Sequence, residues 1–421
     1  MTVLIILFAI IVYYTIGRRW QSLILVALSL YIYWLVAEWN VFIISGIVAI
    51  VLSANAMMQK KRSRLLVVVP IVIIIATFIL FREQFTGIAL PLGYSVLSFS
   101  AISLLIDQYR TPQKYQFVDI ANYLLFFPKI FAGPIERANC FIDRKEKSFN
   151  LPNIYSGFKY LIFASFLKFV VGDMIATTDT SGCGVNATCG IFIYAIGFFF
   201  DFWAYSLMAI GIGRIFGYNL SVSFDRPYYS SSFKEFWHRW NITLGTWLRD
   251  YIYIPLGGNK NSPTKWSLVI LTVFLVSGLW HGSTLPFIIW GIAHGVLMCC
   301  ERFLIKPYRL HGLFKVLYSI MVFIVVSFLW QLFDVSSMSE FISRCSQLCI
   351  PERLELQVSV RLGLCFLLLM IFSSKRVISL ITTNSTEKKA IVSEVGMLTI
   401  MLTILVFLHC PISFNFFYFK F

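Results

Sequence analysis

Long apolar stretches recur along almost the whole chain, and they constrain the fold more than any other feature of the sequence. A helix needs about 20 consecutive apolar residues to cross a lipid bilayer. The candidate spans cover residues 3–17, 21–37, 40–58, 65–82, 88–107, 155–172, 190–216, 266–280, 284–301, 314–333, 358–373 and 391–410. This pattern predicts an all-α polytopic membrane protein with about 11–13 transmembrane or re-entrant helices.

The composition excludes other broad classes of protein. Hydrophobic residues make up 58% of the 421 residues, charged residues only 13%, and the mean hydropathy is +0.79. A soluble fold cannot bury so much apolar surface, because its outer face must carry polar groups. A disordered chain would need low hydrophobicity and high charge, so it is excluded as well.

Basic residues indicate how the spans are oriented. The 35 Lys and Arg residues exceed the 20 Asp and Glu residues, which gives a net charge of +15. The basic residues form four clusters, which follow the first span, follow the third span, lie between the ninth and tenth spans, and precede the last span. Their members, in that order, are Arg18 and Arg19; Lys60, Lys61, Arg62 and Arg64; Arg302, Lys306, Arg309 and Lys315; and Lys375, Arg376, Lys388 and Lys389. If the spans alternate, these clusters share one side, which the positive-inside rule makes the cytoplasm. We therefore expect a multi-pass protein of the cell (inner) membrane with both termini outside.

Two segments do not resemble simple spans. The apolar patch at residues 123–134 is short and interrupted by prolines, so we expect it to be re-entrant or interfacial. Between residues 233 and 251, aromatic side chains recur at helical spacing. Such a helix would place its aromatic face in the bilayer edge or the helix bundle, and leave Lys234, Arg239 and Arg249 near phosphate groups.

Asn241 lies outside this aromatic stripe, in a polar strip with His238 and Gly245. An amide at this position could orient a substrate or a bound donor, since it offers both hydrogen-bond donors and an acceptor. The Pro and Gly residues within residues 253–260 must end the helix.

Two histidines lie within apolar spans. His281 belongs to Ser277-Gly278-Leu279-Trp280-His281-Gly282, and His294 to Trp290-Gly291-Ile292-Ala293-His294-Gly295. An ionisable side chain at membrane depth is costly, so each is a candidate functional residue. A histidine packed against a neighbouring carbonyl explains the context of His281 equally well. No carboxylate or second histidine stands at metal-ligand spacing from His281, so we expect no metal site.

The nine cysteines form no zinc-binding pattern. Cys183 with Cys189, and Cys345 with Cys349, each share a predicted external loop, where disulfides can form. Free thiols are equally compatible with the sequence.

Taken together, the motifs resemble the membrane-bound O-acyltransferase family over most of residues 90–300. The resemblance rests on the run at residues 236–259, on Trp280-His281-Gly282, on the motif around His294, and on Gly133-Pro134-Ile135-Glu136-Arg137. Arg249-Asp250-Tyr251-Ile252-Tyr253-Ile254-Pro255-Leu256-Gly257-Gly258-Asn259 is similar to the bacterial branch of polysaccharide O-acetyltransferases.

The resemblance implies a central tunnel through the bundle and assigns roles to residues. His281 takes the place of the family's catalytic histidine. Asn241 takes the place of its second polar residue, which is His in most bacterial relatives and Asn in many eukaryotic ones. Asn cannot accept a proton at neutral pH, but it can hold a carbonyl or an acceptor hydroxyl. Substrate binding is assigned to His238, Arg239, Arg249, Trp280 and His294.

The C-terminal residues Phe416-Phe417-Tyr418-Phe419-Lys420-Phe421 are similar to an aromatic tail of these acetyltransferases. The resemblance implies that Tyr418 carries the acyl group to an external acceptor and is a third catalytic residue. An aromatic anchor at the outer membrane interface is the alternative, because Phe and Tyr are enriched there.

The implied activity is that of one integral-membrane O-acyltransferase domain over residues 1–421. It would move an acetyl or other acyl group from a cytoplasmic thioester, acetyl-CoA or acyl carrier protein, to hydroxyls of an extracytoplasmic polysaccharide. We expect no permanently bound cofactor and no nucleic acid, but a periplasmic or extracellular acetyltransferase partner. The alternatives are a D-alanyl or lipid acyltransferase, or a transporter or flippase. A transporter would need paired intramembrane charges, whereas Asp107 and Asp201 read as isolated acids.

Overall fold

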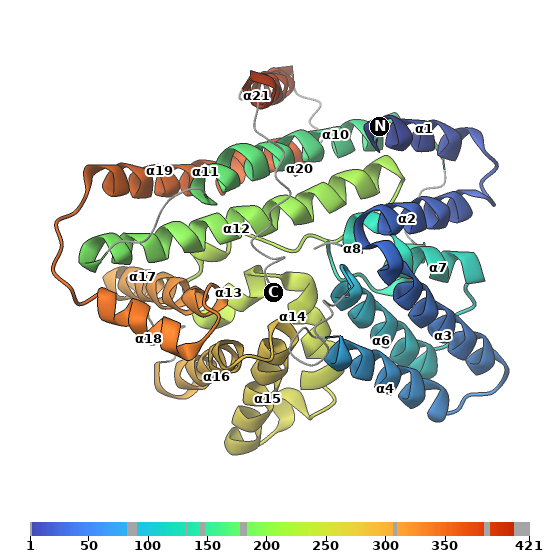
Figure 1. Cartoon of the computed structure of the whole chain (residues 1–421), viewed down its shortest axis with the longest axis horizontal. Coiled ribbons are helices and arrows are strands. Elements are labelled where there is room, and N and C mark those ends of the chain that lie inside the picture. Colours follow the sequence, from blue (N-terminus) through green and yellow to red (C-terminus); the bar gives the residue numbers. More distant parts are fainter. Residues whose placement is uncertain are drawn as a thin grey trace. The chain divides into compact units, whose positions relative to one another are not determined.

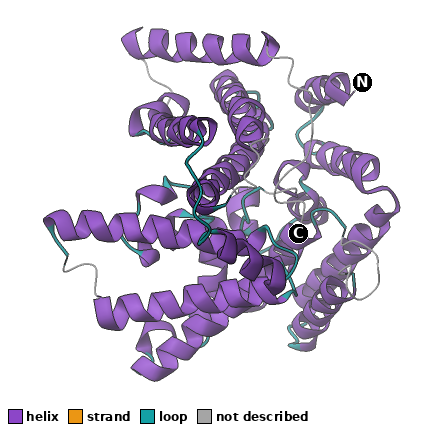
Figure 2. Cartoon of the chain, turned by 60° about the vertical axis from the view of Figure 1, so that its left-hand side comes forward, coloured by secondary structure: helices purple, strands orange, loops and turns teal. Residues whose placement is uncertain are grey.

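The computed structural model describes residues 2–81, 91–130, 133–143, 148–176, 183–305, 310–382 and 388–407. Figure 2 shows helices joined by loops, and none of the residues in these ranges belongs to a strand. The predicted all-α class is therefore confirmed. The chain divides into two compact units, the first made of Met1–Leu161 and Tyr205–Val222 and the second of Ile162–Ala204 and Ser223–Phe421.

The first unit contains the N-terminal helices (Figure 1). They are α1 Thr2–Thr15, α2 Gln21–Ala37, η1 Glu38–Asn40, α3 Val41–Lys60, α4 Leu65–Leu80, α6 Tyr94–Arg110, α7 Phe117–Leu125, α8 Phe127–Ile130, α9 Ala138–Asp143 and most of α10 Leu151–Ser165, which passes into the second unit after Leu161. Helix α12 covers Gly184–Ile215, and its C-terminal part, from Tyr205 onward, also belongs to this unit.

The interrupted segment formed by α7 and α8 is enclosed by protein. Tyr123 and Phe126 are fully buried, and the Tyr123 hydroxyl donates to the backbone oxygen of Glu136 at 2.8 Å. The Glu136 carboxylate accepts hydrogen bonds from the backbone N–H and the hydroxyl of Ser221. Irregular backbone would need this kind of cover at membrane depth, and the re-entrant or interfacial position of the segment stays a prediction.

The second unit contains the remaining elements. They are η2 Phe166–Gly172, α11 Asp173–Ala176, the N-terminal part of α12, η3 Pro227–Tyr229, α13 Phe233–Arg239, α14 Ile242–Leu248, η4 Arg249–Tyr253, η5 Gly258–Lys260, α15 Pro263–His281, α16 Leu285–Cys300, η6 Glu301–Ile305, α17 Gly312–Leu329, η8 Trp330–Phe333, α18 Met338–Gln347, α19 Leu356–Phe372, α20 Lys375–Thr382 and α21 Lys388–Phe407.

A described helix overlaps each predicted span, although residues 82, 88–90 and 408–410 of these spans lie outside the described residues. Several of the helices are long enough to cross a membrane. By length and apolar composition these are Gln21–Lys60, Gly184–Ile215, Pro263–His281, Leu285–Ile305 and Gly312–Phe333, with the bent pair α19–α20 as a sixth if it forms one span. The apolar helices Leu65–Leu80 and Ile391–Phe407 are shorter. The prediction of a multi-pass membrane protein is confirmed.

A buried ion cluster corrects one reading of the sequence. Lys168, which is 1% exposed, lies 2.7 Å from the Asp201 carboxylate and 2.6 Å from that of Asp173. Asp201 is therefore a paired acid and not an isolated one. Sequence spacing missed this because Asp201 lies on α12, whereas Lys168 and Asp173 lie on η2 and α11. Cys183, Cys189, Cys345 and Cys349 are free thiols.

Candidate functional site: a cavity lined by His281 and Asn241

His281 ends helix α15, which packs closely against α16 (Figure 1). Two glycines make the close approach possible. A Cβ atom on Gly278 would overlap the backbone oxygen of Phe287, and one on Gly291 would overlap that of Phe274. Small residues at such crossings let membrane helices pack backbone to backbone.

The imidazole of His281 is half-buried among aromatic rings. Its ring centroid lies 5.4 Å from that of Trp290, 4.9 Å from that of Phe333 and 4.5 Å from that of Trp280. These rings shield the imidazole from bulk water. A proton transferred to or from His281 would therefore move beside these rings, where electrostatic interactions are stronger than in bulk water.

Asn241 lies at a sharp break between α13 and α14. Its φ of 41° is in the left-handed region, which Asn adopts more readily than most residues. Two backbone hydrogen bonds fix the break, from Ile242 N–H to Ser223 O at 2.8 Å and from Asp225 N–H to Arg239 O at 3.0 Å. The prediction of one helix over residues 233–251 is therefore wrong.

The aromatic stripe predicted on that helix is buried within the second unit. Phe233 and Phe236 are 1% exposed and Trp240 is 3% exposed, so the stripe belongs to the protein interior and not to the bilayer edge. The side chain of Asn241 is only 9% exposed, and none of the described residues forms a hydrogen bond with its amide. This amide is available to a ligand in the cavity that it borders.

His281 and Asn241 line the same cavity, which has a volume of about 990 Å³. The cavity follows α15 from Trp266 to His281, which is about 22 Å at the helical rise of about 1.5 Å per residue. Phe198 and Phe202 of α12 close another side. All of its lining residues belong to the second unit, and the cavity extends along α15.

Basic side chains gather at the Trp266 end of the cavity. The basic lining residues are Lys234, His238, Arg249, Arg302, His311 and Lys315. The Arg302 guanidinium lies over the Trp266 ring at 4.0 Å and donates to Asn259 Oδ1 at 3.4 Å. Partial burial, followed by the nearby cations of Lys234 and Arg249, lowers the pKa of His238. Both effects favour the neutral form of the His238 imidazole.

The structure separates the predicted site residues into two groups. His281, Asn241, His238 and Arg249 line the cavity. Arg239, Trp280 and His294 do not, and Arg239 is paired with Glu235 at 2.6 Å. Tyr418 lies outside the described residues. The catalytic and binding roles of all these residues stay predictions.

His294 is buried directly behind the cavity wall. It is 0% exposed, and its ring lies 4.8 Å from that of Trp237 and 5.0 Å from that of Trp290. Neither ring nitrogen has a hydrogen-bond partner among the described residues. Contact with bound substrate would first require Trp237 or Trp290 to move.

Several lining residues were not singled out from the sequence. They include Ser277, Glu301, Arg302, Lys315 and Trp330. Ser277 precedes His281 by one helical turn, so the spacing alone could have placed both side chains on one face. Glu301 is an acid at the end of an apolar span, which is also a usable signal.

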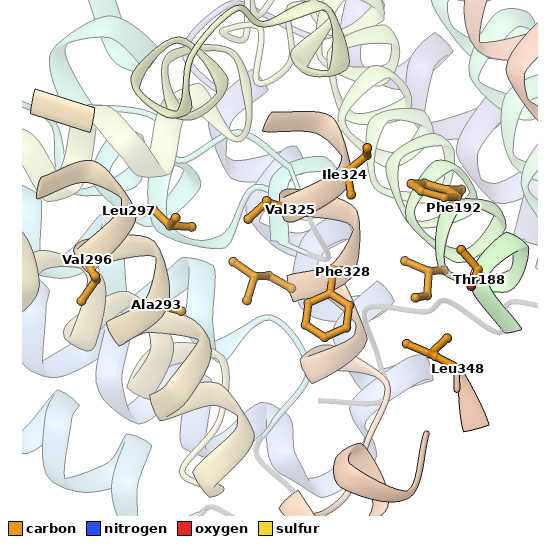
Figure 3. A pocket seen from close by; sticks show the side chains of 11 residues that line it. Thr188, Phe192, Ala293, Val296, Leu297, Ile324, Val325, Phe328 and Leu348 are labelled. Carbon is orange, nitrogen blue, oxygen red and sulfur yellow. The ribbon is translucent and has the colours of Figure 1, made fainter. Parts of the chain in front are cut away.

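A second cavity in the same unit carries no comparable chemistry. Figure 3 shows it bordered by Thr188 and Phe192 of α12, by α16 residues including Val296, and by α17 residues including Phe328. Apart from Thr188, its lining side chains are apolar. Groups of three or more His, Cys, Asp or Glu side chains able to hold a metal ion do not occur within the described ranges.

Comparisons with known proteins identify the family to which the chain is similar. The model of the membrane-bound O-acyltransferase family matches residues 6–340. The chain is 36% identical over 229 residues to a probable alginate O-acetylase AlgI of Pseudomonas aeruginosa, covering 52% of this chain and 44% of the relative.

The names of two other relatives refer to different polymers. A peptidoglycan O-acetyltransferase of Helicobacter pylori is 33% identical over 250 residues, covering 51% of this chain and 47% of the relative. A teichoic acid D-alanyltransferase of Bacillus subtilis is 29% identical over 235 residues, covering 51% of this chain and 60% of the relative. The chain thus matches about half the length of these curated relatives.

Proposed function

Since the chain belongs to the membrane-bound O-acyltransferase family, we propose that it transfers acetyl groups from a cytoplasmic thioester to hydroxyls of an extracytoplasmic polysaccharide. One observation carries this proposal: a single elongated cavity is lined by basic side chains at one end and by His281 at the other. An acyl thioester with a phosphorylated carrier arm would place its phosphates at the basic end of the cavity and its carbonyl group at the His281 end. The polysaccharide acceptor is inferred from the names of the relatives.

In this reaction His281 acts as the general base. It removes the proton of the attacking hydroxyl, whose oxygen forms an ester bond with the thioester carbonyl carbon, and the carbon–sulfur bond breaks. The proton passes to the departing thiolate, so no other reactant is needed. A positioned base contributes about 10²–10⁴ to the rate. The amide of Asn241 donates to the carbonyl oxygen as negative charge develops there.

Two further parts of the proposal concern the external side. Tyr418 takes the acyl group at its phenol oxygen and passes it to the glycan hydroxyl, with a periplasmic or extracellular acetyltransferase completing the transfer. The positive-inside rule, applied to the basic clusters, supports an external position for both termini. A phenol has a pKa near 10, so it needs a nearby base to become nucleophilic. His281 is the base that we propose for it.

D-alanyl transfer is the second candidate, because a D-alanyltransferase is among the relatives. Alkali-released acetate and D-alanine from the cell surface polymers of strains with and without the protein distinguish the two reactions. Loss of acetate alone on deletion supports O-acetylation, and loss of D-alanine alone overturns it. A Tyr418→Phe strain tests the relay separately, since esters at the wild-type amount would exclude an acyl-tyrosine.

Replacing Asn241 by glycine isolates the contribution of its amide. Glycine adopts the left-handed conformation freely, so the α13–α14 break is retained. We expect the rate of ester formation to fall by about 10²-fold, as for other donors to a developing oxyanion. Asn241→Ala removes the same amide but adds backbone strain. If Asn241→Gly keeps more than half of the activity at equal protein amount, Asn241 does not bind the carbonyl.

Arg302→Gln tests whether the basic end binds the donor. The change removes the positive charge and leaves a shorter, neutral amide, so the KM for acetyl-CoA in membrane vesicles should rise several-fold while kcat is retained. The effect should shrink at high salt, where phosphate contacts are screened. Arg376→Gln on α20 is the control, because Arg376 is basic but does not line the cavity. An unchanged KM in Arg302→Gln would place donor binding elsewhere.

A further inference from the structure

Glu301 connects three elements of the second unit. It is the first residue of the π-helical segment η6, which continues α16 without a break, and it is only 4% exposed. Its carboxylate accepts hydrogen bonds from the backbone N–H of Phe233 at 2.5 Å and from that of Lys234 at 3.0 Å. The hydroxyl of Tyr318 on α17 donates to the same carboxylate at 3.0 Å.

These hydrogen bonds complete the N-terminus of α13. The first N–H groups of a helix have no partner within the helix. In α13 the groups of Phe233 and Lys234 donate to Glu301, and that of Glu235 donates to the Ser232 hydroxyl at 3.0 Å. A negative charge at this end is also favoured by the helix dipole. Glu301 therefore fixes α13 to the end of α16.

Helix α13 leads directly to Asn241. It contains only seven residues, and its backbone hydrogen bonds continue to Trp240, whose N–H donates to Phe236 O at 2.8 Å. So short a helix moves as one body, and a shift of its first turn displaces the residue that follows it. The rates of positioned reactions can change about 10²-fold when a group moves by about 1 Å.

We propose that Glu301 is a positioning residue that sets the place of the Asn241 amide in the cavity. This role rests on the proposed function, in which that amide binds the acyl carbonyl. Glu301 holds α13 through a carboxylate because it must accept from two adjacent N–H groups. A glutamine offers one oxygen, and its NH₂ group would face the second N–H donor. That buried N–H would be left without a partner.

Glu301 also borders the cavity near Arg302, so a direct contact with the donor is the competing explanation. A double-mutant cycle separates the two, because residues that act through one another are not additive. The rate measured is that at which labelled acetate enters surface polysaccharide esters in cells with equal amounts of membrane-inserted protein. This assay does not depend on which thioester is the donor.

We expect Glu301→Gln to lower this rate by about tenfold in the wild-type background and by less than about twofold in the Asn241→Gly background. Tyr318→Phe is the matched control, since it removes one hydrogen bond to Glu301 and leaves both bonds to α13 in place. Its rate should stay within about twofold of wild type.

An equal loss from Glu301→Gln in both backgrounds, or no loss in either, would overturn the positioning role. If Glu301→Gln does not reach the membrane, Glu301→Asp enters the same cycle, because it keeps the charge but withdraws the oxygens by one methylene group. If the wild-type strain forms no esters at all, the proposed function fails, and the positioning role fails with it.

Discussion

Replacing His281 by alanine or glutamine should lower acyl transfer by about 10²–10⁴-fold while the protein still inserts into the membrane. Neither substitute can accept a proton at neutral pH, and glutamine retains the capacity for hydrogen bonding. Loss in both variants therefore identifies proton transfer as the function of this side chain. The measurement is the initial rate of ester formation per amount of inserted protein, together with the thermal unfolding temperature in detergent.

His311→Gln is the matched control for this prediction. His311 lines the same cavity, among its basic residues, and is the N-cap residue of α17. Its replacement should affect the KM for the donor at most, by a few-fold, because it is remote from the reacting carbonyl. Should His281→Gln retain wild-type rates, His281 would be a packing residue, as its sequence context alone also allowed.

The apolar spans could be predicted because burial in lipid imposes a length and a composition that a single sequence displays. The break at Asn241 could not. Aromatic and other apolar residues continue at helical spacing across it, from Trp237 and Trp240 to Leu244 and Trp247. A single residue with φ of 41° interrupts the helix without changing that pattern. Backbone hydrogen bonds with Ser223 and Asp225, from a separate segment, stabilise the interruption.

Prediction of the candidate site from the sequence had the same limit: contacts between distant segments could not be foreseen. His281 stood out because an ionisable residue in an apolar span is rare. Glu301 did not, since its partners are backbone N–H groups nearly 70 residues earlier in the chain, at |i−j| of 68 and 67. Arg239 was expected near phosphates. Its guanidinium instead forms an ion pair with Glu235, which lies one helical turn earlier. Pairing decides the availability of a charge, and spacing alone does not reveal the pairing.

Replacing Gly291 by alanine should lower acyl transfer without changing any side chain that lines the cavity. The new Cβ would overlap the Phe274 carbonyl oxygen, so α15 and α16 must separate. Overpacking of this kind costs about 1–3 kcal/mol, and the separation would move His281 relative to Trp290. We expect a lower unfolding temperature in detergent and a loss of ester formation of more than about tenfold.

Gly363→Ala provides the comparison for this change. Gly363 lies within α19, and a Cβ there would meet no atom within 4 Å. Alanine is the better helix former by up to about 1 kcal/mol, so this variant should be as stable as wild type or more stable, with full activity. If Gly291→Ala behaves like Gly363→Ala, the α15–α16 crossing tolerates a wider separation. The geometry around His281 would then depend on the aromatic rings of Trp290 and Phe333 more than on the contact between the two helix backbones.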